Sequence, residues 1–248
     1  MTNEERIRAA WQGRISGCLL GKPVEMISMR EGPEGLHSFL KDSGSLPLRD
    51  YVKYMDHEML RGANKKCCLG MMDKAEADDD ITYLVLALMM MEQYGLDLTT
   101  DDVARSWISL LPVGATFTAE RDSYLKLIEK SNMAYQFGGP RSFDWDEIND
   151  GEYNDWIGAQ IRIDMYGWVL PGKPKLAADL ARRDAILSHR ACAVEASAYI
   201  AALCALIPSS SSREEAVMSA LELIDCLLYT SDAADEGLGV DLGGRRII

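Results

Sequence analysis

The chain has 248 residues and carries 39 acidic against 26 basic side chains, a formal net charge of −13. A surface this acidic repels nucleic acid and anionic membranes, so we expect neither as a partner. The sequence opens without a basic leader or an apolar signal core, and its longest apolar run, Leu84 to Met91, is far shorter than a membrane span, which predicts a cytoplasmic protein.

The first predicted helix begins at the capping box formed by Thr2 and Glu5. Glycines recur every four residues along one of its faces, at Gly13, Gly17 and Gly21. Glycine weakens a helix, so a row of glycines indicates that something approaches the backbone closely. Tight packing of another helix and approach of a ligand both explain the row.

Helical spacing of apolar residues dominates the rest of the chain, and no alternating strand pattern appears. Residues 29–56 are rich in Gly, Pro, Ser and charge, which predicts a long irregular segment, and residues 132–155 predict another. Helices are predicted at 79–95, 100–111, 118–132, 174–187, 191–206 and 213–225. The sequence therefore predicts an all-α protein with one domain over residues 1–225 and no internal boundary.

Three consecutive aspartates, Asp78, Asp79 and Asp80, fall at the N-cap and first turn of the helix predicted at 79–95. Adjacent carboxylates repel one another, and oxygen donors of this kind are ligands for hard cations such as Mg²⁺. Capping of the helix and compensation of its dipole are the alternative, although one aspartate would serve for that. The residues alone leave both interpretations open.

Other functional classes fit less well. A diphosphate-binding D-D-x-x-D motif would need an acid at Tyr83, and an HD-type phosphohydrolase needs more histidines than His37, His57 and His189. The adjacent Cys67 and Cys68 lack a second pair and make a poor tetrahedral zinc site.

We interpret residues 226–248 as a segment that does not belong to the natural protein. The runs 226–236 and 239–248 resemble the translation of the two arms of a sequencing-library adapter. We therefore expect residues 226–248 to be a non-native, artefactual tail that is not part of the folded domain. On this interpretation the natural sequence stops near Asp225, inside a helix.

Four segments together resemble one known family. Gly17–Glu25 is similar to a GDxxGxPxE pattern, and Asp78–Ile81 to T/S-D-D-T. Trp156–Arg162 is similar to a G-x-x-x-R segment, and Asp184–His189 to a helix ending in S/T-H. In this order and spacing they resemble the ADP-ribosylglycohydrolase family over roughly residues 6–206, and Thr118–Arg121 is similar to a bacterial branch of it.

The resemblance implies an all-α, orthogonal multi-helix domain that binds two Mg²⁺ or Mn²⁺ ions and hydrolyses an N- or O-glycosidic ADP-ribosyl bond. It implies metal ligation by Asp78, Asp79 and Asp80, catalytic roles for Glu25 and Asp79, and substrate binding by Gly158, Arg162 and His189. The partner would be an ADP-ribosylated protein or a small-molecule conjugate, and the acceptor stays open. An ion pair is the alternative for Arg162, and a contact with a helix dipole for His189.

The chain also departs from the pattern. Cys18 stands where the family often has aspartate, and Asp78 where it has threonine or serine. The family's second metal motif would lie beyond Asp225, so we expect the C-terminal helices to be missing, and the chain as written to bind metal weakly and turn over little. The alternative is a catalytically inactive relative that binds ADP-ribose or serves structurally.

Overall fold

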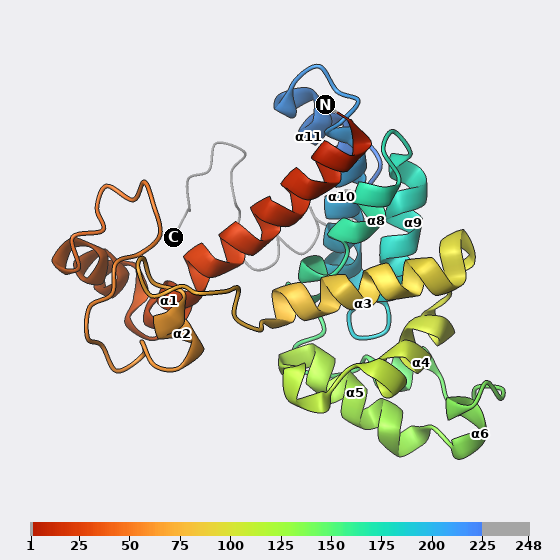
Figure 1. Cartoon of the computed structure of the whole chain (residues 1–248). Helices are drawn as coiled ribbons and strands as arrows, with labels where there is room; N and C mark the ends of the chain where they lie inside the picture. Colours follow the sequence, from red (N-terminus) through yellow and green to blue (C-terminus); the bar gives the residue numbers. More distant parts are fainter. Residues whose placement is uncertain (1, 225–248) are drawn as a thin grey trace, which may run out of the picture. The chain divides into compact units, whose positions relative to one another are not determined.

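The computed structural model describes residues 2–224, and within them it is helical (Figure 1). These residues form no β-strand, only an isolated bridge between Lys53 and Leu69. The predicted all-α class is confirmed. The predicted tail at 226–248 and the predicted end of the natural sequence near Asp225 lie outside the described residues.

Contacts divide the chain into two compact units, one up to Thr82 and one from Tyr83 onward. Helix α3 (Asp79–Tyr94) begins in the first unit and continues in the second. The single domain predicted over residues 1–225 stays a prediction.

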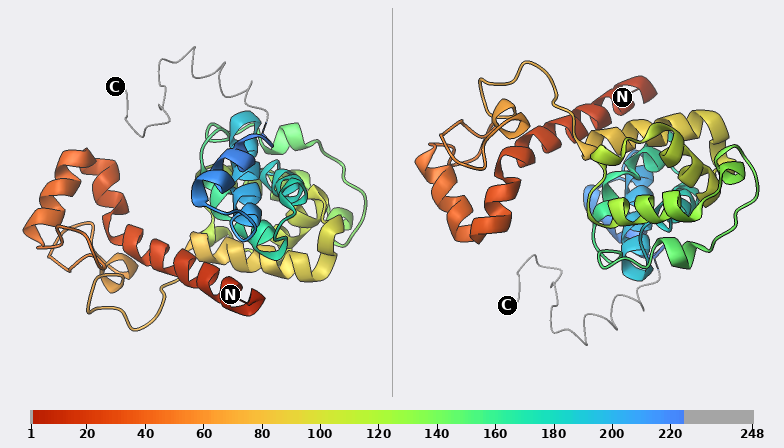
Figure 2. Two further views of the ribbon diagram at one scale, coloured as in Figure 1. Left: turned by 90° about the horizontal axis from the view of Figure 1, so that it is seen from above. Right: turned by 90° about the horizontal axis from the view of Figure 1, so that it is seen from below.

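The first unit is built on a long helix, α1 (Asn3–Asp42), whose predicted capping box of Thr2 and Glu5 is present. The prediction of irregular chain over residues 29–56 is wrong in its first part, because α1 continues to Asp42. Gly32 breaks the helix with a φ of 68°, and Pro33 restarts it in a first turn, where a missing N–H costs nothing. Figure 2 shows the resulting change of helix direction.

The chain after α1 folds back as irregular segments around one short helix, α2 (Ala63–Lys66). Its buried side chains form a small apolar core with the far half of α1: Ile27, Phe39, Val52, Leu60 and Cys68. This core fixes the end of α1 against the segment that leads to α3.

The second unit contains the remaining helices. After α3 come α4 (Thr100–Leu110), α5 (Thr118–Lys130), α6 (Met133–Gln136), α7 (Trp145–Ile148), α8 (Asp164–Val169), α9 (Pro174–Ala185), α10 (Ala191–Leu206) and α11 (Arg213–Leu221). Three 3₁₀ turns, η1 (Gly95–Asp97), η2 (Val113–Ala115) and η3 (Gly158–Ile161), lie between them. All six helices predicted in this region are present; the last, predicted at 213–225, is helical over Arg213–Leu221, and its predicted last residue lies outside the described residues. Among residues 2–224, no helix combines the length and the apolar character that crossing a bilayer requires.

Small residues let α10 pack closely against its neighbours α8, α9 and α11. The buried face of α10 consists mostly of alanine. Gly167 of α8 faces it so closely that an added Cβ would lie 2.5 Å from the carbonyl oxygen of Ala201 and 2.4 Å from the Cβ of Cys204. This contact brings α8 and the preceding turn η3 against the body of the unit.

Candidate functional site

The aspartates lie where the sequence predicts them. Asp78 directly precedes α3, and its Oδ1 accepts a hydrogen bond of 3.1 Å from the amide of Asp80, as a helix cap does. Asp79 and Asp80 occupy the first turn of α3. One carboxylate therefore caps the helix, and two more are present than capping needs.

A stripe of polar side chains on α1 meets these aspartates within the first unit. Its members, Arg14, Cys18, Lys22 and Glu25, follow one another at three- and four-residue spacing and so share a helix face. Arg14 Nη1 donates to Asp80 Oδ1 at 3.1 Å, and the Lys22 ammonium contacts Asp78 Oδ2. The stripe supplies two cations to a cluster of three acids.

The electrostatics of the three carboxyl groups differ. Burial opposes ionisation of Asp78, but hydrogen bonding to Lys22 and the charge of Lys22 hold its pKa below the usual range. Burial and the neighbouring Asp78 raise the pKa of Asp79 to about 7. The pKa of Asp80 rises to about 6, because burial and the charges of Asp78 and Glu25 outweigh the opposing charge of Arg14.

The donor set at this place fits a divalent cation. Sγ of Cys18 and one carboxylate oxygen each of Asp78 and Asp80 all lie within 4.8 Å of one another. Burial, together with the charges of Asp78 and Asp80, raises the pKa of the Cys18 thiol to about 12, so the thiol is protonated in the absence of a cation. Burial is the main reason that the pKa values of Asp79 and Asp80 are raised, with the neighbouring carboxylates adding to it, and a bound cation would favour the ionised form of these groups.

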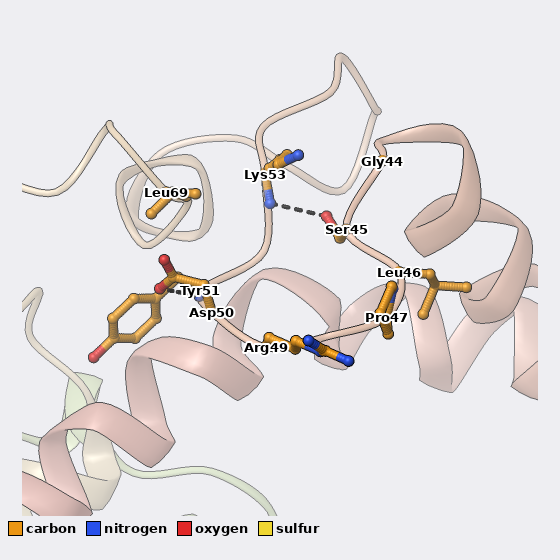
Figure 3. A pocket seen from close by; sticks show the side chains of 9 residues that line it. All are labelled: Gly44, Ser45, Leu46, Pro47, Arg49, Asp50, Tyr51, Lys53 and Leu69. Carbon is orange, nitrogen blue, oxygen red and sulfur yellow. Dashed lines mark hydrogen bonds between the residues drawn. The ribbon is translucent and has the colours of Figure 1, made fainter.

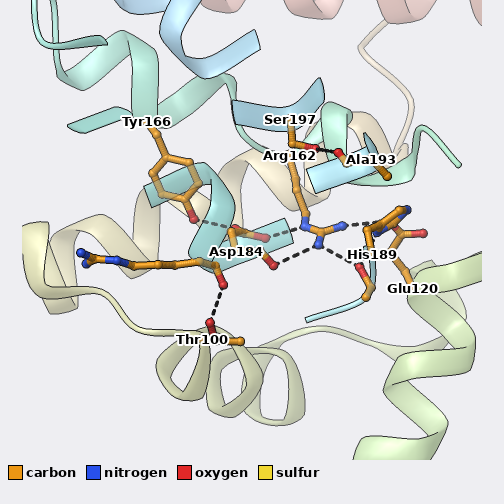
Figure 4. A network of polar contacts seen from close by, with 10 residues as sticks. Thr100, Glu120, Arg162, Tyr166, Asp184, His189, Ala193 and Ser197 are labelled. Atoms are coloured by element: carbon orange, nitrogen blue, oxygen red, sulfur yellow. Dashed lines mark hydrogen bonds and ion pairs between the residues drawn. The ribbon is translucent and has the colours of Figure 1, made fainter. Parts of the chain in front are cut away.

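Two of the predicted substrate-binding residues, Arg162 and His189, belong to a buried network of polar contacts in the second unit (Figure 4). Arg162 follows η3 and is 1 % exposed. Its Nε donates to Asp184 Oδ1 at 2.5 Å and its Nη1 to Glu120 Oε1 at 2.8 Å. Its Nη2 donates to the Ser188 hydroxyl at 2.9 Å and to the carbonyl oxygen of Asp184.

These contacts favour the ion-pair alternative for Arg162, because each nitrogen of its guanidinium already has a protein partner. The guanidinium also lies over the rings of Trp107 and Tyr83, at 5.1 Å and 5.7 Å from the ring centroids. The Tyr166 hydroxyl donates to Asp184 Oδ2 at 2.5 Å. The predicted contact of Arg162 with a substrate diphosphate stays a prediction.

His189 follows α9 and is fully buried beside this network. Its Nδ1 is 2.7 Å from the Ser188 hydroxyl, and its Nε2, without a hydrogen-bond partner among the described residues, lies 3.9 Å from Glu120 Oε1. Burial and the charge of Arg162 lower the pKa of His189 to about 3. The imidazole is therefore neutral at physiological pH.

Gly158, at the start of η3, makes room for the Glu120 carboxylate. A Cβ at Gly158 would lie 2.5 Å and 2.7 Å from the two carboxylate oxygens. Burial raises the pKa of Glu120 despite the charge of Arg162. Gly158, Arg162 and His189 therefore share one neighbour, Glu120.

Sequence reasoning assigned no role to several residues of these two clusters: Arg14, Lys22, Glu120, Tyr166, Asp184 and Ser188. A signal existed for the first two, because Arg14, Cys18 and Lys22 form an i, i+4, i+8 polar row. Glu120 and Asp184 lie in two of the segments that resemble the family, Thr118–Arg121 and Asp184–His189, but nothing in those segments indicates that they pair with Arg162. Their partners lie 42 and 22 residues away, so only the fold brings them together.

A cavity of about 440 Å³ lies elsewhere in the first unit (Figure 3). Its lining comes from the segment after α1 and from Leu69, and it includes the cationic side chains of Arg49 and Lys53. The backbone amide of Lys53 donates to the Ser45 hydroxyl at 3.0 Å, which ties two sides of the cavity together. None of the predicted site residues lines this cavity.

Comparison with known proteins identifies the family. The family model for ADP-ribosylglycohydrolase matches residues 1–240, nearly the whole chain. No curated protein and no solved structure matches. The family match agrees with the motif order in the sequence and with the helical fold, and the chain belongs to the ADP-ribosylglycohydrolase family.

Proposed function

We propose that this protein is a metal-dependent hydrolase that cleaves an N- or O-glycosidic ADP-ribosyl bond in an ADP-ribosylated protein or small-molecule conjugate. Membership of a glycosidic-bond hydrolase family supports hydrolysis as the reaction class. The observation that carries the metal dependence is the donor group of Cys18, Asp78 and Asp80, whose ligand atoms all lie within 4.8 Å of one another.

Asp78, Asp79 and Asp80 are the proposed ligands of Mg²⁺ or Mn²⁺, because these cations prefer oxygen donors. When bound, the cation would polarise ribose oxygens and lower the pKa of a coordinated water. Asp79 is the proposed proton acceptor, since its carboxyl group lies in the first turn of α3 between the other two proposed ligands and could take a proton from a water held there. Exposed Glu25 is the proposed second catalytic carboxylate, stabilising the positive charge that develops on the ribose.

Gly158, Arg162 and His189 are the proposed substrate-binding residues. The neutral imidazole of His189 carries a nitrogen without a protein hydrogen bond, which supports a role in contacting a polar ligand group. For Arg162 the surrounding acceptors support a positioning role, since it holds Glu120 against Gly158 and Ser188 against His189.

The decisive experiment compares the unmodified chain with Asp78→Asn and Asp80→Asn. Mg²⁺ and Mn²⁺ binding is measured by calorimetry, and release of ADP-ribose is measured from ADP-ribosylated arginine and serine peptides. Both variants should lose metal affinity and activity. Asp73→Asn, an exposed acid of the same segment, is the matched control. Unchanged metal binding in Asp78→Asn would contradict the proposed ligand set.

A second candidate is a catalytically inactive relative that binds ADP-ribose. One observation favours it: Lys22 and Arg14 already pair with Asp78 and Asp80, where cations would bind. An internal cation of this kind can replace a metal in neutralising carboxylates. ADP-ribose binding that is independent of Mg²⁺ and Mn²⁺, without any hydrolysis, would favour this candidate.

A further inference from the structure

Cys18 is the one member of the metal-binding group that is not a carboxylate. It lies on α1, one turn from Lys22, with its sulfur among the carboxylate oxygens of Asp78 and Asp80. The family pattern often has aspartate at this position, so a sulfur donor is a property of this chain. We propose that Cys18 is a metal ligand, and that its thiolate turns the site toward softer divalent cations such as Zn²⁺ or Co²⁺ and away from Mg²⁺.

The geometry supports coordination by these three groups. Donors bound to one tetrahedral ion at about 2.0–2.3 Å lie about 3.3–3.8 Å from one another. The sulfur and the two oxygens lie within 4.8 Å of one another, so each has only a short distance to move to bind one ion. The donors also come from two elements, since α1 carries Cys18 and the start of α3 carries the aspartates.

The chemistry of the donors decides which cation they prefer. Mg²⁺ requires near-octahedral oxygen coordination, and sulfur does not satisfy it. Thiolate ligands favour Zn²⁺ and other borderline or soft metals, and mixed sulfur and oxygen sets bind Co²⁺ as well. One sulfur among two carboxylates therefore lowers the relative affinity for Mg²⁺ without removing a charge from the site.

Binding through sulfur is a balanced exchange. The S–H bond of Cys18 breaks, its proton passes to solvent, and a sulfur–metal bond forms. The Lys22 ammonium and the Arg14 guanidinium give up their contacts with Asp78 and Asp80 to the cation. Both cations remain near the site, where they offset part of the three negative charges of the thiolate and the two carboxylates.

The test is a Co²⁺ titration of the full chain, in a non-thiol reductant, followed by absorption in the near ultraviolet, where thiolate-to-cobalt charge transfer appears. Cys18→Ser is compared with Cys192→Ser, a matched control on α10 of the second unit. The charge-transfer band should be present in the parent and in Cys192→Ser and absent in Cys18→Ser. Calorimetry should show Co²⁺ affinity falling by about tenfold or more in Cys18→Ser. Circular dichroism checks that each variant is folded.

A second variant, Cys18→Asp, places the family's residue at the position and should shift the preference back toward Mg²⁺. The proposal rests on the proposed metal dependence, and the outcomes separate the two. Binding of Co²⁺ and Mg²⁺ without a sulfur band, unaltered in Cys18→Ser, would overturn the role of Cys18 and leave the proposed function intact. Failure to bind Co²⁺, Zn²⁺ or Mg²⁺ at all would overturn both.

Discussion

The two units each contain a cluster of acids and bases, and the clusters are built differently. In the second unit, Arg162 and its two carboxylate partners are between 1 % and 5 % exposed, and every nitrogen of the guanidinium donates a hydrogen bond. In the first unit, three adjacent aspartates share two cations, and the pKa values of two of them are raised. A buried network that is almost fully paired holds a structure together, whereas unpaired charge costs stability and indicates a binding role.

The largest effect should follow removal of Arg162. Arg162→Met leaves Glu120 and Asp184 buried without their cation, so the free energy of unfolding should fall by about 3–5 kcal/mol. Urea unfolding at neutral pH measures it. Arg8→Met removes an exposed i, i+4 pair with Glu4 and should cost less than about 0.5 kcal/mol. Equal losses in the two variants would show that the network adds no more than a surface pair.

Glycines offer a second contrast between the units. Gly167→Ala forces a Cβ against the backbone of α10 and should destabilise the protein by about 1–3 kcal/mol. Gly17→Ala meets no atom within 4 Å in its own unit and should stabilise helix α1 by about 0.5–1 kcal/mol. Thermal and urea unfolding measure both effects.

Gly17→Ala also separates the two explanations of the glycine row. A stabilised variant that loses ADP-ribose binding would support close approach of a ligand along α1. A destabilised variant would support the other explanation, in which another helix packs tightly against the glycine row. No atom lies within 4 Å of an added Cβ at Gly17 among the described residues of the first unit.

Most of the helices and part of the site could be predicted from the sequence, because both depend on local patterns. Apolar spacing located α3 to α5 and α9 to α11, and the aspartate run located the start of α3. The prediction of irregular chain over residues 29–56 fails in its first part because it rests on a composition rich in Gly, Pro, Ser and charge, whereas the helix resumes at Pro33 after the single break at Gly32. The Arg162 network could not be predicted in detail, since Glu120 and Asp184 meet it only through packing of α5, η3 and α9.

A smaller effect concerns the pH dependence of stability. The pKa of His189 is about 3 in the folded protein and about 6.5 in an unfolded chain. Below pH 6.5 His189 gains a proton in the unfolded chain but stays neutral in the folded protein. The free energy of unfolding therefore falls with decreasing pH by up to about 1.4 kcal/mol per pH unit. Above pH 6.5 this contribution is constant.

His189→Gln should remove this part of the pH dependence. Urea unfolding of parent and variant at several pH values between 5 and 8 should give a difference that grows in favour of the variant as pH falls. His37→Gln makes the same substitution at an exposed histidine and should follow the parent. A constant difference between His189→Gln and the parent would show that the pKa of His189 is the same in the folded protein as in the unfolded chain.

The smallest effect should come from Asp79, and it has the opposite sign. Its pKa of about 7 lies above the unfolded value near 3.9, so ionising Asp79 above pH 4 costs stability, and the cost is complete above pH 7. Asp79→Asn should therefore stabilise the metal-free protein at pH 8 by about 1 kcal/mol, after allowance for solvent screening.

The same substitution should weaken Mg²⁺ or Mn²⁺ binding, because a proposed ligand is lost. Urea unfolding and calorimetry on one preparation measure both quantities, with Asp73→Asn as the control for removing one charge from the segment. Greater stability together with weaker metal binding would mean that the carboxylate of Asp79 destabilises the metal-free protein and contributes to binding of the cation. Lower stability with unchanged metal binding would place Asp79 with the structural carboxylates, alongside Glu120 and Asp184.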